Sequence, residues 1–580
     1  GVVQALLADP GLCEALRAQV LAKAPDGERL ALALQTTRFD PDATEARTVR
    51  LVRNSLALLV DAYKLVQFTK RGEALLREAT ATPAPLQSLL QEFDIARKLQ
   101  ACAPLLEQIE TVVDADRLNR GYSKQGSYQI HVHPGSDRAL SSLHEEMVQL
   151  NERIWAESLA FAASHNADLV RFSCHGRYEE VSIAASDAGP SKATVVESRK
   201  RRRKAVVLNL ERNRVHSTFF RTSKADGETV VGPRGPKQSA NANIISRDKV
   251  GLRFRSPALE QLVSDFDKLV HKYRLAERAV VEAALNAARP HADAVRDLAL
   301  FLAKLDALAG FAVAAGAYDY CRPQLTVAGS GALAIVNGRH ALLEQVVGRE
   351  KFVANSFEAR TKACPEAVAV ITGPNMGGKS VFCRQQALIA VMAQIGCFVP
   401  ADTATVPIFD AVLARVGAAD DSSIGASTFM VEMAGMAAIL KRATPASLVV
   451  VDEIGRGTSV SDGFGLAHAI SRHLAEKTGC VAMLATHFHE LADLAQLRLS
   501  DRDTPLTRNL HMQAIVQSTG SAAEVVMLYQ VAAGPTSKSY GIAIARMAGF
   551  PESVVENAQR ELAAIELKHG LNAKADLVPT

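Results

Sequence analysis

The sequence has no long apolar run and no paired cysteines. Its most apolar stretch, around Ala307 to Tyr318, is shorter than the roughly 20 residues that a membrane-spanning helix needs, so we expect no membrane segment. The eight cysteines are scattered without a CxxC pair, which is typical of reduced thiols inside a cell and not of a disulfide framework or a zinc site. Residue 1 is Gly, so the sequence could be a fragment, and the absence of a targeting signal does not indicate where the protein is located.

Net charge is also low, at +4, but it is unevenly distributed. Residues 166–250 contain 17 Lys and Arg against 9 Asp and Glu, so this stretch carries +8 and the remainder −4. Such an asymmetry indicates a surface that meets phosphates. The run RKRRRK (Arg199 to Lys204) taken alone is consistent with a solvated basic loop or with a nuclear-import signal.

The pattern of apolar residues divides the 580 residues into several domain-sized parts. Two stretches that flank the basic region carry heptad-like spacing, and we expect them to pair as long antiparallel helices with a small β-rich module at their tip. Two unrelated helices around an inserted domain are the alternative. The heptad positions are Leu140, Leu143, Met147, Leu150 and Ile154 in the first stretch, and Leu259, Leu262, Phe266, Leu269, Tyr273, Ala276 and Val280 in the second.

A phosphate-binding pattern occupies the centre of the chain. Residues 373–380 read GPNMGGKS, which fits G-x-x-x-x-G-K-[ST], and they follow an expected strand, Val368 to Thr372, and precede a helical pattern. The glycines allow backbone N–H groups to approach phosphate oxygens, and the helix directs its positive end at the same anion. Lys379 can reach the β- and γ-phosphates, and the Ser380 hydroxyl can ligate Mg²⁺.

Two further strand ends complete this pattern. The stretch SLVVVDEIGRG reads as a buried strand that ends at Asp452, a Mg²⁺ ligand in such folds, and Glu453, which can polarise the attacking water. The stretch VAMLATHFHEL reads as another strand, and His487 at its end could contact the γ-phosphate. His489 is interpreted as structural.

Several blocks in one order resemble the MutS-like DNA mismatch repair ATPases. They include TGPNMGGKS, DEIGRGTSVSDGFGLAHAI, ATHFHEL and the C-terminal SYGIAIARMAGFP. The stretches IGCFVPA, LARVGA and FPESVVENAQRELAAIE are most similar to the eukaryotic shared subunit of mismatch-recognition heterodimers. The resemblance implies a mostly α-helical core and coiled-coil lever with a small β-rich clamp insertion, followed by an α/β P-loop (ABC-type) ATPase domain. The boundaries are 1–137 helical core, incomplete at its start; 138–165 lever helix; 166–254 β-rich clamp; 255–290 returning lever helix; 291–325 helical core; 326–550 ATPase domain; and 551–580 C-terminal helical dimerisation segment and tail.

The resemblance also implies roles for single residues and for partners. Asn375 would contact the phosphate region, Phe352 would stack on adenine, and Ser427 would reach the nucleotide of a partner subunit. The full nucleotide set is Phe352, Gly373, Pro374, Asn375, Met376, Gly377, Gly378, Lys379, Ser380 and, in trans, Ser427; the catalytic set is Glu453, Asn375 and His487; the metal set is Ser380 and Asp452; and the DNA-contacting set is Arg171, Arg177, Arg221 and Lys224. The implied cofactors are ATP and Mg²⁺. The implied partners are duplex DNA, a second MutS-homologue subunit and a MutL-type downstream factor, in the nucleus.

The sequence departs from the family pattern in places. Val381 stands where the family usually has Thr, and TSVSDG replaces TSTYDG, but neither change removes a phosphate or metal ligand, so we expect ATP hydrolysis to survive. No counterpart of the mismatch-reading and connector domains is found, so this chain alone is not expected to read a mismatch.

Three other functions remain to be weighed. A meiotic MutS homologue that binds recombination junctions is the alternative within the family. A P-loop kinase of a small substrate needs neither the STFM signature nor a basic lever tip, and a nucleotide-binding structural protein has little use for Glu453.

Overall fold

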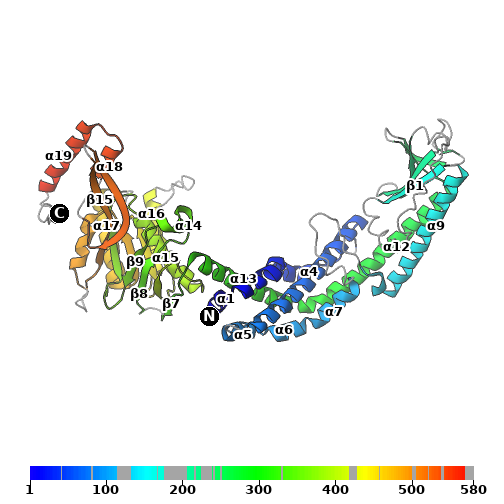
Figure 1. Cartoon of the computed structure of the whole chain (residues 1–580), viewed down its shortest axis with the longest axis horizontal. Helices are drawn as coiled ribbons and strands as arrows, with labels where there is room; N and C mark the ends of the chain where they lie inside the picture. Colours follow the sequence, from blue (N-terminus) through cyan, green and yellow to red (C-terminus); the bar gives the residue numbers. More distant parts are fainter. Residues whose placement is uncertain are drawn as a thin grey trace. The chain divides into compact units, whose positions relative to one another are not determined.

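The computed structural model shows a multidomain chain of mixed helical and sheet structure, which divides into two compact units (Figure 1). We call Glu14–Leu305 the helical unit, and Gly1–Cys13 with Asp306–Thr580 the α/β unit. The structure describes residues 1–40, 42–79, 83–113, 132–165, 167–174, 206–213, 217–223, 238–239, 242–247, 251–327, 331–416, 428–455, 458–498, 505–519, 522–536 and 541–568.

The helical unit begins with short and long helices and continues into two long paired ones. The first group is α2 (Pro10–Gln19), η1 (Leu21–Lys23), α3 (Gly27–Thr36), α4 (Glu45–Glu78), α5 (Pro83–Glu92), α6 (Ile95–Ala101), α7 (Ala103–Val112) and η2 (Pro134–Ser136). The paired helices are α9 (Arg138–Ser164) and α12 (Pro257–Ala288), followed by η3 (Arg289–His291) and α13 (Ala292–Tyr318). Helix α13 begins in the helical unit and ends in the α/β unit.

Local sequence explains where the two paired helices begin. The Asp137 carboxylate accepts hydrogen bonds from the N–H groups of Ala139 (2.8 Å) and Leu140 (3.2 Å), and so caps α9. The Ser256 hydroxyl accepts from the Leu259 N–H at 3.1 Å, and Pro257 stands at the first position of α12. The two helices contact each other, and both carry buried apolar residues at spacings of three, four and seven: Leu140, Met147 and Ile154 on α9 and Leu259, Val263, Phe266, Val270 and Tyr273 on α12.

Between these helices the chain forms a six-stranded sheet in the order β1-β2-β3-β6-β5-β4. The strands are β1 (Ala167–Cys174), β2 (Val206–Asn213), β3 (Ser217–Thr222), β4 (Gln238–Ser239), β5 (Ala242–Arg247) and β6 (Leu252–Arg255). Three aromatic rings join the sheet to α9: the ring of Phe161 stacks on that of Phe220 with centroids 5.0 Å apart, and both contact Phe254. Aromatic burial therefore fixes the module on the end of the helix.

Helical residues continue without a break from Pro257 to Tyr318, and this run is long and apolar enough, by length and composition alone, to cross a membrane. Its most apolar 18-residue window has a mean hydropathy of 1.9, which differs from our expectation that no stretch reaches the required length. One such helix is weak evidence for a span, because core helices pass the same test. Here Leu298, Phe301 and Leu305 are buried within the protein.

The α/β unit contains two sheets. The larger has the order β12-β13-β14-β10-β15-β16 and is parallel except for the β15–β16 hairpin; the smaller has the order β7-β11-β8-β9. The elements are α1 (Val2–Ala8), β7 (Gln324–Thr326), β8 (Leu333–Gly338), α14 (Leu343–Val347), η4 (Arg349–Lys351), β9 (Asn355–Ala359), β10 (Val368–Thr372), α15 (Lys379–Gln394), β11 (Thr403–Pro407), β12 (Val412–Arg415), α16 (Thr428–Arg442), β13 (Leu448–Asp452), α17 (Val460–His473), η6 (Leu474–Thr478), β14 (Val481–Ala485), η7 (His489–Gln496), β15 (Arg508–Thr519), β16 (Ala522–Ala533), α18 (Gly541–Met547) and α19 (Glu552–Lys568).

Both faces of the larger sheet are covered. Strands β10, β13 and β14 are buried at every residue, as expected for central strands of a parallel sheet with helices on both sides. Apolar residues of α15 pack on one face, and those of α16 and α17 pack on the other. The loops that follow these three strands therefore meet at one edge of a rigid layer.

Candidate functional site

Three polar segments lie together at the carboxyl edge of β10, β13 and β14. These neighbouring strands are followed by Gly373, by Glu453 and by Thr486 respectively. The ladder continues past the strand ends, because the Glu453 N–H donates to the Ala485 carbonyl (2.9 Å) and the Thr486 N–H donates to the Ile371 carbonyl (3.0 Å). Main-chain hydrogen bonds thus hold the three segments in fixed register.

The loop between β10 and α15 has backbone angles that suit glycine. Gly373 has φ 136° and Gly378 has φ 102°, and a side chain at Gly373 would approach Met512 to 3.0 Å. Met376, at φ 61°, is a non-glycine residue in the left-handed region and is 91% exposed. Because α15 starts at Lys379, its positive N-terminal end faces the space that the loop encloses.

Lys379 is buried, with 4% of its surface exposed, although its side chain carries a charge. Its ammonium donates hydrogen bonds to the carbonyls of Gly373 (2.9 Å) and Pro374 (3.0 Å), inside the loop. These bonds offset part of the cost of burying the charge. The loop therefore presents a fixed positive charge next to a helix N-terminus, which suits a polyphosphate.

The metal residues predicted from sequence lie at the same edge. Ser380 is the second residue of α15, and Asp452 is the buried last residue of β13. The Asp452 Oδ1 atom is buried and has no hydrogen-bond partner, so a cation or its water ligand would satisfy it. Among the described residues no group of three or more His, Cys, Asp or Glu side chains could hold a metal ion.

Glu453 and His487 form a close pair. His487 Nε2 lies 2.6 Å from Glu453 Oε1, and both side chains are partly exposed. Glu453 has φ 58°, a left-handed conformation that costs a non-glycine residue of the order of 1–3 kcal/mol, so the structure maintains a strained residue here. A cavity of about 210 Å³ opens in front of the pair, lined also by Ile454, Gly455, Thr458, Val460 and Phe488.

Two other residues lie next to the turn after Glu453 and next to the phosphate loop, and the sequence motifs did not predict either of them. The Glu432 carboxylate on α16 accepts a hydrogen bond from the Gly455 N–H at 2.6 Å, and so fixes the turn after Glu453. Tyr529 on β16 has φ 54° and lies at the phosphate loop, 3.5 Å from where a side chain of Gly378 would begin. Their positions depend on how α16 and β16 pack, which short-range patterns do not reveal.

The remaining predicted nucleotide residues are distributed as follows. Asn375 is exposed in the loop, Pro374 and Gly377 are buried in it, and Phe352 is half-buried directly after η4. Ser427 lies outside the described residues. The residues predicted to be catalytic and the loop residues thus lie at one edge of the sheet, whereas the position of the residue expected to act in trans is not described.

Of the predicted DNA-contacting residues, Arg177 and Lys224 lie outside the described residues, and Arg171 is described only as part of β1. Arg221 on β3 is half-buried and stands directly opposite Arg253 on β6. Arg253 is a further basic residue on the same sheet, and the sequence did not single it out.

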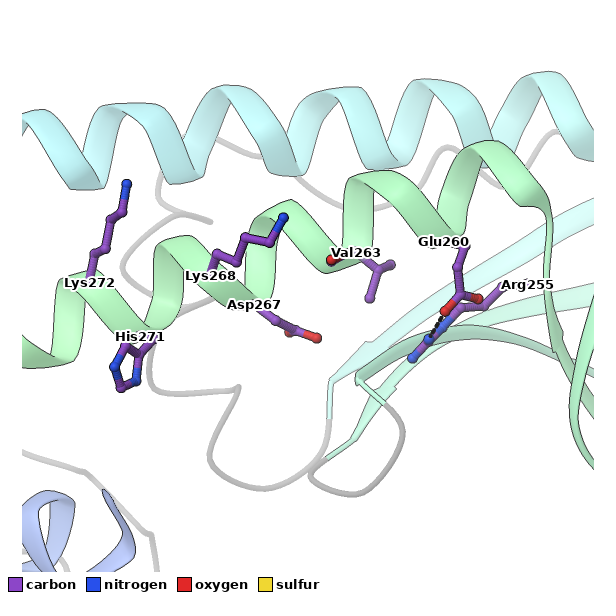
Figure 2. A pocket seen from close by; sticks show the side chains of 8 residues that line it. Arg255, Glu260, Val263, Asp267, Lys268, His271 and Lys272 are labelled. Carbon is purple, nitrogen blue, oxygen red and sulfur yellow. Dashed lines mark hydrogen bonds and ion pairs between the residues drawn. The ribbon is translucent and has the colours of Figure 1, made fainter. Parts of the chain in front are cut away.

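Figure 2 shows a second cavity, of about 790 Å³, along α12 next to the strands. Its lining is mixed in charge: Arg255, Glu260, Val263, Ser264, Asp267, Lys268, His271 and Lys272. The Arg255 guanidinium pairs with Glu260 at 2.8 Å, and the Lys268 ammonium pairs with Asp265 at 3.1 Å. These pairs neutralise two of the basic groups that line the cavity.

Comparisons with known proteins agree with the geometry of the α/β unit. Residues 369–566 match the family model of MutS domain V. The chain is 31% identical to DNA mismatch repair protein msh-2 of Neurospora crassa over 97% of this chain and 54% of that protein, and 31% identical to DNA mismatch repair protein spellchecker 1 of Drosophila melanogaster over 98% and 54%. It is 36% identical to DNA mismatch repair protein MutS of Geobacillus kaustophilus over 73% of this chain and 45% of that protein. The chain spans about half the length of these relatives, and it belongs to the MutS family.

Proposed function

We propose that this chain is the ATP-hydrolysing and DNA-clamping part of a mismatch repair protein of the MutS family, in which ATP switches the clamp. The observation that carries the proposal is the meeting, at one sheet edge, of a buried loop lysine, an unsatisfied buried carboxylate and a carboxylate–imidazole pair. Lys379 and the α15 N-terminus bind the phosphates, and Ser380 with Asp452 holds Mg²⁺, which supplies charge stabilisation when bound.

In this proposal Glu453 accepts the proton of the attacking water. The 2.6 Å contact with His487 orients the carboxylate, and the cavity that both residues line has room for the attacking water. Asn375 contacts the phosphate region, and Phe352 stacks on the adenine base. The exposed position of Asn375 and the half-buried position of Phe352 are compatible with these roles.

A second subunit completes the site in this proposal. Large apolar side chains are exposed on the phosphate loop and on two helices of the α/β unit: Met376 on the loop is 91% exposed, Val460 on α17 is 76% exposed, and Met430 on α16 is 62% exposed. Large apolar side chains that remain exposed are typical of a surface that a protein partner covers. We assign this partner as a second MutS-homologue subunit, whose nucleotide Ser427 reaches in trans, and α19 as part of the dimerisation segment.

Duplex DNA is the proposed substrate of the β-rich part. The opposed Arg221 and Arg253 and the +8 charge of residues 166–250 favour sequence-independent contacts with phosphates. DNA would then stimulate ATP hydrolysis, and a MutL-type factor in the nucleus would receive the signal. The names of the similar proteins favour mismatch repair over the meiotic alternative.

The substitution Glu453→Gln tests the proposed function. Glutamine keeps the shape of glutamate and its contact with His487 but cannot accept a proton, so nucleotide binding should persist while turnover falls about 100-fold or more. Binding of a fluorescent ATP analogue and steady-state phosphate release, measured on the assembled dimer, separate the two effects. The control is Glu490→Gln, an exposed carboxylate in η7, which should leave both unchanged. Normal turnover in Glu453→Gln would remove the general base from the proposal.

A further inference from the structure

The end of α13 is held by charged side chains from one short segment, residues 339–352, which we call the anchor segment. This segment lies between β8 and β9 and contains α14 and η4. Its last residue is Phe352, the proposed adenine-stacking residue. One stretch of 14 residues therefore contacts the end of a long helix and also contains a residue of the proposed nucleotide site.

The first contact is a buried ion pair. Arg339 Nε lies 2.7 Å from Glu344 Oε2, and the two side chains are only 7% and 2% exposed. The guanidinium also donates through Nη2 to the carbonyls of Tyr318 (3.2 Å) and Asp319 (3.3 Å). Carbonyls at the end of a helix have no partner within the helix, so Arg339 both satisfies them and places a positive charge at the negative end of α13.

The second contact lies at the surface. Arg349 Nη2 lies 2.8 Å from the Asp319 carboxylate, and Asp319 has φ 53°, the left-handed conformation common just after a helix. This pair lowers the pKa of Asp319, first through the hydrogen bond and then through the charge of Arg349. Arg349 starts η4, and the Phe352 N–H donates to the carbonyls of Gly348 and Arg349 at 3.2 Å each. A single turn thus connects Asp319 to Phe352.

Just beyond the segment, Asn355 connects the chain to the phosphate loop. Its side-chain amide donates to the Tyr529 carbonyl at 2.9 Å, and its Oδ1 atom accepts from the Val531 N–H at 2.7 Å. Tyr529 lies against Gly378 of the loop. Contacts therefore join Asn355 to the phosphate loop and Phe352 to the last residues of α13, and only two residues of the chain separate Phe352 from Asn355.

We propose that Arg339, Glu344 and Arg349 are positioning residues that couple nucleotide occupancy to the end of α13. The inference rests on the proposed nucleotide site and adds a route by which nucleotide binding there affects the end of α13. A base bound against Phe352 orders η4, and η4 in turn orders Asp319 through Arg349. Helix α13 ends the helical run Pro257–Tyr318, and this run starts next to the β-rich sheet in the sequence. The three positioning residues therefore act on the helix that connects the two units in sequence.

Hydrogen exchange on the assembled protein tests this coupling. In the wild type, a nonhydrolysable ATP analogue with Mg²⁺ should slow amide exchange in residues 312–320 by about 5-fold or more, the lower end of typical coupling between sites. Arg349→Ala removes only an exposed ion pair, so the fold should persist, and the slowing should fall below about 2-fold while the analogue still binds. Arg349→Lys keeps the charge and should restore part of the effect.

Further variants separate coupling from folding. Glu344→Gln should give the same loss as Arg349→Ala, whereas Arg472→Ala, which breaks an exposed ion pair with Glu476 on another helix, should keep the full slowing. Slowing that persists in both Arg349→Ala and Glu344→Gln would overturn the assignment. Bound analogue without any slowing in the wild type would overturn the coupling and leave the ATPase proposal standing. If no analogue binds to the wild type, the coupling and the ATPase proposal both fail.

Discussion

At Lys379, burial and charge act against each other. The ammonium is almost fully buried and donates hydrogen bonds to two loop carbonyls, which offset part of the free-energy cost of removing the charge from water. A charged side chain that is buried in this way is typical of a binding residue, because a purely structural position would favour an apolar side chain. Asp452, with its buried and unpartnered Oδ1 atom, shows the same kind of conflict with the opposite charge.

Lys379→Met separates binding from folding at this position. Methionine keeps an unbranched stem but removes the buried charge, so the melting temperature should stay the same or rise. Nucleotide affinity should fall at least about 10-fold, which corresponds to about 1.4 kcal/mol. Calorimetry and titration with a fluorescent ATP analogue measure the two quantities, and Lys477→Met, at an exposed lysine of η6, is the control. Unchanged affinity in Lys379→Met would mean that its charge does not face the phosphates.

Short-range patterns predicted part of this site and not the rest. The residues that follow buried strands, Asp452, Glu453 and His487, were predicted because a strand end is visible in sequence and parallel strands share an edge. Tyr529 and Glu432 were not, because each reaches the site through packing of an element far away in the chain. The strained φ of Glu453 also has no sequence signal.

At the scale of elements, the seam between α9 and α12 differs in detail from its prediction. The strand Val368 to Thr372 is confirmed as β10, and the two helices pack as expected. On α12, however, Val263 and Val270 are buried, whereas Leu262 is only half-buried. Apolar residues in a heptad can be spaced three then four residues apart, or four then three. The prediction used the first order and so placed Leu262, and not Val263, in the seam. The partner helix decides between the two readings, which is tertiary information.

A close contact between α3 and α13 gives a stability prediction. A Cβ atom at Gly27 would lie 2.2 Å from that of Ala299, so Gly27→Ala forces the two helices apart and should cost about 1–3 kcal/mol. Gly310→Ala is the matched control, because this exposed glycine in the middle of α13 has no atom within 4 Å of the added group. Alanine there should stabilise the helix by up to about 1 kcal/mol.

Thermal unfolding followed by circular dichroism distinguishes the two glycines. A destabilisation of about 1 kcal/mol lowers the melting temperature of a domain of 150–250 residues by about 2–4 °C. The transition of Gly27→Ala should therefore move down and that of Gly310→Ala should stay or move up. Equal melting temperatures for Gly27→Ala and the wild type would show that α3 and α13 do not pack this closely.

At the scale of the whole molecule, the order of strands is the part that sequence could not supply. Alternating strands and helices after about Thr326 indicated an α/β architecture, but not that β15 would pair with β10 or that β16 would close the edge as a hairpin. Strand order follows from which long-range pairings bury the most apolar surface, and many orders share one local pattern. The placement of Tyr529 at the phosphate loop is a direct consequence of that order.

The last prediction concerns how the whole molecule holds DNA. Binding to phosphates releases counterions, so affinity should be steeply dependent on salt and indifferent to sequence or to a mismatch. Neutralising Arg171, Arg177, Arg221 and Lys224 together should lower the slope of log affinity against log salt by about 0.9 for each phosphate that the protein no longer neutralises. A separate variant that neutralises Arg199 to Lys204 tests the basic run, which lies outside the described residues and could serve DNA binding or nuclear import.

The control for this experiment removes the same amount of charge elsewhere. Lys362, Lys441, Arg472 and Lys477 are exposed residues of the α/β unit, and their neutralisation changes net charge by the same four units. If DNA is held by local contacts, the control should keep the wild-type slope, because exposed charges beyond about 10 Å are largely screened at 0.1 M salt. Arg253→Ala extends the test to the residue opposite Arg221 and should lower the slope by about 0.9 by itself. An unchanged slope in both the four-residue variant and the basic-run variant would show that neither set of charges neutralises a phosphate, and it would contradict the proposed DNA-contacting set.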